Sequence, residues 1–340
     1  MFGGKTLLIT GGTGTFGNAM LRRFLDTDIQ EIRVFSRDEK KQEDLRILYN
    51  SPKLKFVVGD VRDISSCHDA VEGVDYIFHA AALKQVPACE FYPMEALQTN
   101  AIGAEILMRA ATQARVGKVV LLSTDKAVYP ANAMGISKAM MEKLMIARAR
   151  MSASKGVTMC ATRYGNIMGS RGSVIPLFVR QIMLKQPLTL TDPHMTRFMM
   201  TIEDAIELVL YAFEHSEPGD IFVKKATSIN MGDLAEAVKK VFNSDVPVEV
   251  IGARHGEKYY ETLLTREEMG SAIDCGNYYR VPADSRGMNY YVKDNSNGPG
   301  VNGHDDYHSS STPRVCVDQM AEILMKLEVV QQGLKGILPD

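Results

Sequence analysis

The feature that most restricts the fold of this chain is a glycine-rich segment, residues 11–17, between an apolar run and a helical pattern. Glycines at its first, fourth and seventh positions let the backbone turn tightly, approach a pyrophosphate and pack a helix on a strand. The free N–H groups at the start of that helix favour phosphate binding. Such glycines are weak evidence alone but specific after the first strand of a βα unit. We expect cofactor contacts from Gly11, Thr13, Gly14, Thr15, Phe16 and Gly17.

Strand-like and helical patterns alternate through the first half of the chain. The apolar runs cover residues 6–10, 32–35, 54–58, 76–79, 119–122 and 157–162, and the main helical patterns cover 14–26, 95–114 and 134–151. This alternation predicts an α/β fold with a doubly wound parallel sheet covered on both faces, a Rossmann fold. Its ligand is expected at the carboxyl ends of the strands.

Beyond residue 163 the regular alternation stops, which predicts a second, smaller unit. Helical patterns cover residues 174–185, 202–215, 230–242 and 317–327, and strand patterns cover 221–223 and 248–251. We expect a nucleotide-binding domain over residues 1–165 and a substrate-binding lobe over 166–283, from which a late strand or helix returns to the sheet. Residues 284–313 are expected to form a long loop and residues 314–340 a C-terminal helix and tail.

Composition excludes several classes of protein. The 39 basic and 41 acidic residues give a net charge of -2, which does not indicate a protein that binds nucleic acid or an anionic membrane. No apolar run approaches the ~20 residues that span a bilayer, and the chain begins with a strand pattern rather than a signal peptide. Five scattered cysteines without a Cys-x-x-Cys motif fit a reduced cytoplasm and no metal site.

Cofactor choice is predicted from the residues that follow the second and third strands. The second strand ends in Ser36 and Arg37, with Lys41 close behind, and these side chains suit the 2′-phosphate of NADP. Asp38 keeps NAD as the less favoured alternative. After the third strand, Asp60 and Val61 are expected beside the adenine; the alternative for the aspartate is a helix N-cap.

Four further motifs carry a family resemblance: residues 79–87, 99–100, 123–126 and 163–166. With them the chain resembles the extended short-chain dehydrogenase/reductases that act on nucleotide sugars. More closely, it is similar to the inverting UDP-N-acetylglucosamine 4,6-dehydratases, in the branch that starts UDP-N-acetyl-L-fucosamine synthesis for capsules and O-antigens. Matching stretches at 172–176, 196–198, 254–258 and 261–263 extend the resemblance over about residues 5–286, whereas 287–313 match less well.

The resemblance implies a reaction without net redox change. NADP⁺ takes hydride from C4 of the sugar, a base removes the C5 proton, and the C6 hydroxyl leaves as water. Hydride then returns to C6, and C5 is reprotonated on the opposite face. In this family pattern Ala80, Ala81 and Asn100 belong to the cofactor site, and Lys84 to cofactor and sugar.

The proton chemistry is unusual because Met134 stands where most short-chain dehydrogenases have a tyrosine, four residues before Lys138. A thioether is no general acid or base. By resemblance, Asp125, beside Thr124, is the acid for the C6 hydroxyl, and Lys126 is the base for the C5 proton. Burial is expected to depress the pKa of this base, which also becomes the simplest acceptor for the C4 hydroxyl proton. Lys138 would bind the nicotinamide ribose.

Substrate binding and assembly are also implied by the resemblance. Arg197 and Arg254 would bind the diphosphate, and Asn166, Val174 and Glu257 would complete the UDP-sugar site. Met140, Met141 and Met145 lie on the helix that pairs subunits in related enzymes, which predicts a homodimer. The family precedent extends to a hexamer latched by the C-terminal loop, where residues 289–291 suit an interface.

Two other functions remain open as alternatives. A UDP-hexose 4-epimerase shares the fold, cofactor and first hydride transfer but normally uses the missing tyrosine. A non-catalytic NADP-binding sensor needs no tyrosine at all, although the Asp125–Lys126 pair and the substrate-side arginines argue against it. The sequence leaves open the exact sugar and whether C3 is also epimerised.

Overall fold

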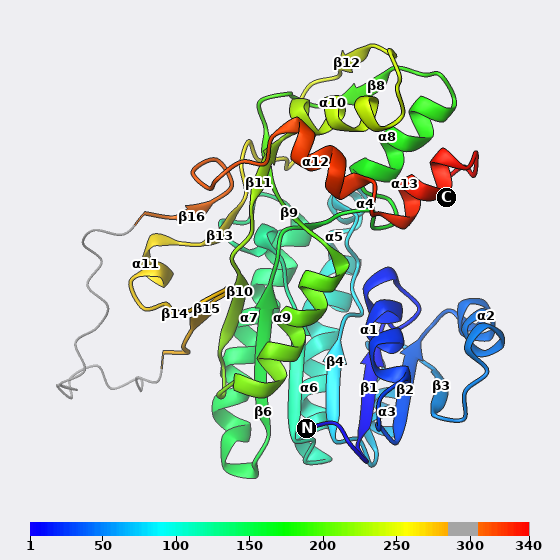
Figure 1. The fold of residues 1–340 in the computed structure, drawn as a ribbon. Helices are drawn as coiled ribbons and strands as arrows, with labels where there is room; N and C mark the ends of the chain where they lie inside the picture. Colours follow the sequence, from blue (N-terminus) through cyan, green and yellow to red (C-terminus); the bar gives the residue numbers. More distant parts are fainter. Residues whose placement is uncertain (285–304, 340) are drawn as a thin grey trace.

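The computed structural model describes residues 1–284 and 305–339, which form a large sheet region with a smaller lobe at one end (Figure 1). The sheet has the strand order β14-β15-β10-β6-β5-β4-β1-β2-β3. In this order, the strands from β10 through to β3 are mutually parallel. At the other edge, β15 is antiparallel to β10, and β14 is antiparallel to β15. The predicted doubly wound parallel sheet is therefore confirmed.

The strands of the first half follow the predicted runs to within one residue at each end. They span Thr6–Thr10 (β1), Glu31–Ser36 (β2), Leu54–Val58 (β3), Tyr76–His79 (β4), Lys118–Leu122 (β5) and Thr158–Arg163 (β6). The late strands of the same sheet are Ile221–Lys224 (β10), Ile273–Cys275 (β14) and Tyr278–Val281 (β15). Because β10 pairs with β6, the chain returns to the sheet after entering the small lobe. The sequence-based domain boundaries stay a prediction.

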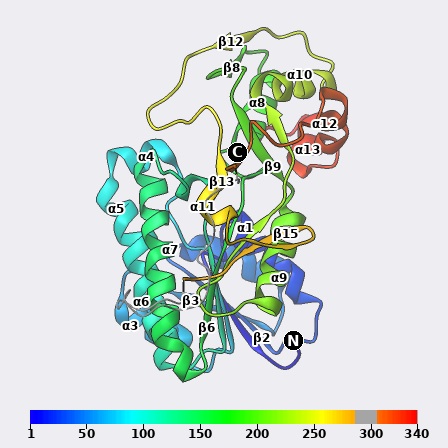
Figure 2. The same ribbon diagram turned by 90° about the vertical axis from the view of Figure 1, so that its left-hand side faces the viewer.

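Helices cover both faces of the sheet, and each layer encloses its own apolar core (Figure 2). One face carries α3 (Ile64–Val71), α6 (Gly103–Gln113) and α7 (Ala133–Ser152). The other carries α1 (Thr15–Leu25) and α9 (Ile202–His215). Strands with both faces buried explain the nearly continuous apolar runs in the sequence.

A π-turn interrupts the long helix predicted over residues 95–114. The chain forms α5 (Pro93–Leu97), then the π-turn Gln98–Ile102, and only then α6. Inserted turns of this type are common at functional sites. Here the turn buries Asn100 completely, under the loop that follows β4.

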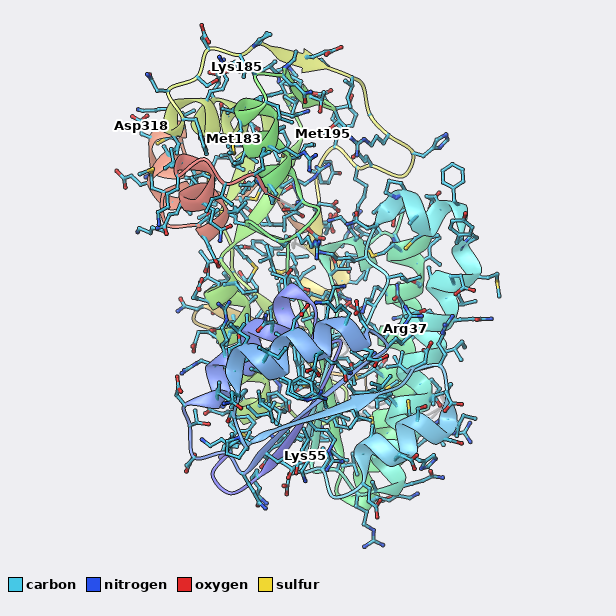
Figure 3. The ribbon with its side chains drawn as sticks, turned by 90° about the vertical axis from the view of Figure 1, so that its right-hand side faces the viewer. Arg37, Lys55, Met183, Lys185, Met195 and Asp318 are labelled. Atoms are coloured by element: carbon cyan, nitrogen blue, oxygen red, sulfur yellow. The ribbon has the colours of Figure 1, made fainter. Side chains whose placement is uncertain are left out.

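The small lobe has a separate core built from segments far apart in the sequence. It contains α8 (Val174–Met183), β8 (Leu188–Leu190), α10 (Met231–Val241) and β12 (Val248–Val250). The helix predicted over 317–327 is shorter, α12 (Val317–Leu324), and a further helix that was not predicted, α13 (Glu328–Leu334), follows it; both contribute to this core. Figure 3 shows Met183, Met195 and Asp318 in this lobe, above the sheet region that carries Arg37 and Lys55.

Three short strands connect the small lobe to the sheet region. They are β7 (Asn166–Ile167), β9 (Thr196–Met200) and β11 (Ser228–Asn230). Nearby, β13 (Thr262–Leu264) pairs with β16 (Tyr307–His308), followed by the buried Ser309. The predicted interface residues 289–291 lie outside the described residues.

The methionines of α7 are divided between the core and the outer surface of the helix. Met141 and Met145 are fully buried in the core beneath α7, whereas Met140 is exposed. Residues one helical step apart point in different directions, so the three cannot share one outer surface. Within residues 1–284 and 305–339, no helix combines the length and apolarity needed to cross a bilayer.

Candidate active site

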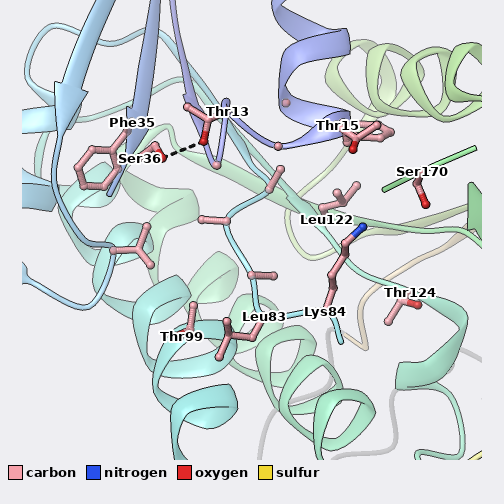
Figure 4. A pocket seen from close by; sticks show the side chains of 18 of the residues that line it. Thr13, Thr15, Phe35, Ser36, Leu83, Lys84, Thr99, Leu122, Thr124 and Ser170 are labelled. Carbon is pink, nitrogen blue, oxygen red and sulfur yellow. Dashed lines mark hydrogen bonds between the residues drawn. The ribbon is translucent and has the colours of Figure 1, made fainter. Parts of the chain in front are cut away.

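A cavity of about 640 Å³ lies at the carboxyl ends of the parallel strands (Figure 4). Its lining includes the glycine-rich loop, the ends of β2 and β3, the loop after β4 and the start of α7. All predicted cofactor residues but Asn100 line it: Gly11, Thr13, Gly14, Thr15, Phe16, Gly17, Ser36, Arg37, Lys41, Asp60, Val61, Ala80, Ala81, Lys84 and Lys138. Its position matches the ligand-binding crevice of doubly wound folds.

Two glycines of the loop are required by close backbone approach. Gly11 has a φ of +66°, and a Cβ there would lie 2.8 Å from the backbone nitrogen of Ala81. A Cβ on Gly17 would lie 2.5 Å from the carbonyl oxygen of Gly11. No side chain caps α1, whose N-cap is Gly14, so the first N–H groups of this helix are free to bind phosphate.

Polar and charged side chains that follow β2 line the cavity. Ser36 Oγ lies 2.9 Å from Thr13 Oγ1 (Figure 4). Asp38, which also lines the cavity, caps α2 (Glu39–Tyr49): its carboxylate accepts from the backbone N–H of Lys41 at 3.0 Å and pairs with the Lys41 ammonium at 2.7 Å. These hydrogen bonds hold the pKa of Asp38 below its usual value. Arg37 is largely exposed, with one guanidinium nitrogen 3.4 Å from Asp60.

Asp60 is fixed by its neighbour rather than by a helix end. Its carboxylate accepts from the Arg62 backbone at 2.9 Å and from the Arg62 guanidinium at 2.7 Å. Burial raises the pKa of Asp60, but these contacts outweigh it and the net shift is downward. Since Asp63 caps α3, the alternative N-cap role for Asp60 is wrong.

Asn100 lies behind the cavity and supports its wall, in contrast to the predicted cofactor contact. Its Oδ1 accepts from the backbone N–H of Leu83 at 2.8 Å, and its Nδ2 donates to the Leu83 carbonyl and to Ser137 Oγ, both at 2.9 Å. The π-turn points the amide inward, so the side chain connects the loop after β4 to α7.

Met134 and Lys138 line the cavity from the first turns of α7, and both are 5% exposed. Lys138 Nζ donates to the carbonyl oxygen of Leu122 at 2.8 Å. Burial lowers the pKa of Lys138 to about 8. Nearby, burial and the charge of Lys138 lower the pKa of His79 to about 3, so this imidazole is neutral at physiological pH.

A second cavity, of about 560 Å³, lies between the sheet region and the small lobe. Five predicted substrate residues line it: Asn166, Val174, Arg197, Arg254 and Glu257. Lys84, the sixth, lines the first cavity instead, where burial lowers its pKa and its Nζ donates to the Arg171 carbonyl at 3.0 Å. This bond joins the loop after β4 to the loop that leads to α8.

Lys126 is the residue shared by the linings of the two cavities. Its Nζ lies 3.0 Å from Asp125 Oδ1, 3.3 Å from Asn166 Oδ1 and 3.4 Å from Glu261 Oε1. Burial lowers the pKa of Lys126, but the carboxylates of Asp125 and Glu261 outweigh it, and the net shift is upward. The expectation that burial would depress this pKa is therefore wrong.

Asp125 is completely buried and lines neither cavity. Oδ1 accepts from Thr124 Oγ1 and from Lys126 Nζ, both at 3.0 Å, whereas Oδ2 has no hydrogen-bond partner among the described residues. Burial raises the pKa of Asp125 and the charge of Lys126 lowers it, whereas the charge of Glu261 raises it further, so the net shift is upward.

The site also contains Glu261, the first residue of the matching stretch 261–263, for which no role was predicted from the sequence. Its carboxylate is 3% exposed, lines the second cavity and contacts Lys258 Nζ at 3.0 Å as well as Lys126. Burial raises the pKa of Glu261, but the positive charges of Lys126, Lys258 and Arg197 outweigh burial, and the net shift is downward. This contact joins segments distant in the sequence, so no local pattern identifies it. The described residues hold no group of three or more metal-binding side chains.

Comparisons with known proteins agree with this geometry. A family model described as polysaccharide biosynthesis protein matches residues 7–283. A protein named UDP-glucose 4-epimerase from Rickettsia bellii (strain RML369-C) is 57% identical over 340 residues, covering 99% of this chain and 100% of the relative. The protein of the same name from Rickettsia felis is 56% identical with the same coverage.

Solved structures are also similar to this chain over most of its length. The X-ray structure of Pen from Bacillus thuringiensis has a TM-score of 0.87 and 33% identity, covering 96% of this chain and 99% of that one. The dTDP-glucose 4,6-dehydratase DesIV from Streptomyces venezuelae, solved with NAD, has a TM-score of 0.69 and 25% identity, covering 75% and 86%. The chain therefore belongs to the polysaccharide biosynthesis protein family of extended short-chain dehydrogenase/reductases, enzymes that modify nucleotide sugars.

Proposed function

We propose that this protein is an NADP-dependent UDP-N-acetylglucosamine 4,6-dehydratase that inverts C5. The observation that carries the proposal is the pairing of a non-titratable Met134 at the cofactor with the Asp125–Lys126 pair at the junction of the two cavities. Elimination across C5 and C6 needs an acid and a base close together, whereas 4-epimerisation needs neither at C6. The product would be the first intermediate towards UDP-N-acetyl-L-fucosamine for a capsule or O-antigen, made in the cytoplasm.

The residues divide the elimination between them. A bound nicotinamide would accept the hydride of C4 and return it to C6. The neutral amine of Lys126 would accept the C4 hydroxyl proton and release it to water in the second cavity before the elimination. Lys126 takes the C5 proton, Asp125 gives a proton to the departing C6 hydroxyl, and water leaves. The raised pKa of Asp125, caused by burial and by Glu261, favours a proton on this carboxyl once Lys126 has given one up.

Because the pKa of Lys126 is raised, the deprotonation of its ammonium is the central step. An ammonium cannot accept a proton, so Lys126 must first lose one. Transfer from Lys126 Nζ to Asp125 Oδ1, 3.0 Å away, converts the ion pair into a neutral amine and a neutral acid. Because Asp125 is completely buried, Lys126 or Thr124 must shift for the acid to touch the C6 hydroxyl.

The residues that line the two cavities suggest which of them would bind the substrate and which the cofactor. Arg197 and Arg254 would meet the diphosphate in the second cavity, and Lys138 the nicotinamide ribose in the first. We assign the 2′-phosphate of NADP to Arg37 and Lys41, since Asp38 is engaged with the helix it caps. A homodimer, extending to a hexamer, remains part of the proposal; a monomer in light scattering would contradict it.

A UDP-glucose 4-epimerase is the second candidate, favoured by the names of the Rickettsia relatives. It would use the same cofactor and hydride transfer at C4. It would give Asp125 no part in the reaction, and a group other than Met134 would have to accept the C4 hydroxyl proton.

One experiment separates the two candidates. Purified protein is incubated with UDP-N-acetylglucosamine, and separately with UDP-glucose, in D₂O, and the products are analysed by proton NMR and mass spectrometry. A dehydratase gives loss of one water, a new C6 methyl doublet and deuterium at C5 with inverted configuration. A C4 epimer without loss of water or uptake of deuterium would establish the epimerase instead.

A further inference from the structure

Glu261 is the buried group beside the reacting pair to which the proposed mechanism assigns no step. Its carboxylate lies 3.4 Å from Lys126 Nζ, on the side of the ammonium that also meets the second cavity. Asp125 contacts the same ammonium at 3.0 Å. One ammonium therefore lies between two carboxylates that are 0% and 3% exposed.

The backbone of Glu261 is held independently of its carboxylate. Its N–H donates to Ser309 Oγ at 3.0 Å, and its carbonyl accepts from the Ser309 N–H at 2.8 Å. Ser309 is itself fixed to Thr196 through its hydroxyl. Replacing the carboxylate by an amide keeps these backbone contacts, so we expect such a variant to retain the local fold.

We propose that Glu261 is the positioning residue that controls the loss of a proton from the Asp125–Lys126 pair and holds Lys126 at the junction of the cavities. The proposal deepens the dehydratase function and, for the catalytic consequence, depends on it. The charge of Glu261 acts in the same direction on both partners, because it raises the pKa of Asp125 and of Lys126.

The remaining charges near Lys126 do not replace this effect. Among the described residues, the charged groups around it are Asp125 on its own turn, Glu261 and Lys258 before β13, and Arg197 on β9. Arg197 lowers the pKa of Lys126 and so opposes the two carboxylates. When Asp125 is protonated, Glu261 remains as the counter-ion of the ammonium.

The proposal predicts a specific change in the pH profile. The acid limb reports the first deprotonation of the Asp125–Lys126 pair, and the alkaline limb reports Lys138, whose pKa is about 8. In Glu261→Gln the acid limb moves to lower pH by about 1 unit or more, while the alkaline limb stays in place. The weaker base lowers kcat about tenfold or more, with a smaller change in KM.

Two variants separate this role from a structural one. Glu261→Asp keeps the charge and restores the acid limb at least partly. Glu268→Gln is the matched control, because Glu268, in the short helix α11 (Arg266–Met269), is also a paired carboxylate but contacts Arg163 rather than Lys126. It lowers stability without moving either limb. If Glu261→Gln lowers kcat at every pH with unmoved limbs, Glu261 is only structural and the proposal is overturned.

A second measurement needs no turnover. The Lys126 amine, 21% exposed, is labelled with trace acetic anhydride across a pH series, and the modified peptide is quantified by mass spectrometry. Labelling of Lys126 is expected to begin at lower pH in Glu261→Gln than in the parent, and unchanged labelling overturns the proposal. If the parent does not dehydrate UDP-N-acetylglucosamine, the proposed function fails, and this measurement still decides whether Glu261 controls Lys126.

Discussion

Lys138 Nζ donates a 2.8 Å hydrogen bond to the carbonyl oxygen of Leu122, where β5 ends at the first cavity. The bond fixes the amine of α7 against the sheet. A second contact, to Met141 Sδ at 3.6 Å, leaves one proton of the ammonium for a ligand. The site therefore combines a buried cation with a neighbour, Met134, that carries no proton. Burial holds the pKa of this lysine at about 8, close to the pH at which an enzyme works.

The first prediction concerns Lys138→Met, which should remove activity but not stability. The folded-state pKa, about 8, is lower than the ordinary 10.5, so burial of the charged amine destabilises the fold, with the full penalty below pH 8. The penalty disappears as pH rises from about 8 to 10.5. At pH 7 we expect a Tm no lower than that of the parent and a kcat reduced about 100-fold or more. Thermal unfolding and product formation measure the two effects.

Lys143→Met is the matched control for this prediction. Lys143 lies on the same helix but is exposed, so its loss should change Tm and kcat little. For the parent enzyme, activity should fall as pH rises through about 8, as Lys138 loses its charge. Full activity in Lys138→Met would contradict a role of this amine at the cofactor.

The second prediction concerns Met134→Leu, which should retain activity. Met134 is 5% exposed and packs against Cys89 and Ala96. An exchange that conserves volume costs less than about 1.5 kcal/mol, and leucine, like methionine, has no proton to give. We expect kcat within about threefold of the parent in the D₂O assay. A loss of about 100-fold would show that the thioether has a chemical role.

The third prediction concerns cofactor choice. Arg37→Ala should weaken NADP binding by about 10- to 100-fold while changing NAD binding little, because only NADP presents a 2′-phosphate to the guanidinium. Lys40→Ala is the control, since Lys40 pairs with Asp44 on α2 outside the cavity lining. Isothermal titration with both dinucleotides measures the ratio. Equal losses for NADP and NAD would indicate that Arg37 does not read the phosphate.

Local patterns were sufficient to predict the sheet and the phosphate loop. Apolar runs predicted the parallel strands because both faces of those strands are buried. Gly11 and Gly17 were predictable because no Cβ fits at either position. The polar residues that follow these strands meet at one edge for the same topological reason.

Contacts between distant segments could not be predicted in this way. The pKa of Lys126 was expected to fall because burial alone lowers it, but the carboxylates of Asp125 and Glu261 together reverse the direction, and Glu261 comes from a distant segment next to β13. Asn100 was assigned to the cofactor because a regular helix gives no reason to bury it. The π-turn that directs it to Leu83 has no clear signature in residues 98–102.

The fourth prediction follows from Asn100, which is completely buried and makes three hydrogen bonds, two to Leu83 and one to Ser137. Asn100→Ala leaves these partners unpaired, which should lower the free energy of unfolding by about 2–4 kcal/mol. Thr99→Ala is the control on the same turn: Thr99 Oγ1 has no hydrogen-bond partner among the described residues, so stability should hold or rise. Denaturant unfolding measures both. Because Leu83 lines the cofactor cavity, Asn100→Ala should also weaken dinucleotide binding about tenfold. Unchanged stability would mean that the loop after β4 is held by other contacts.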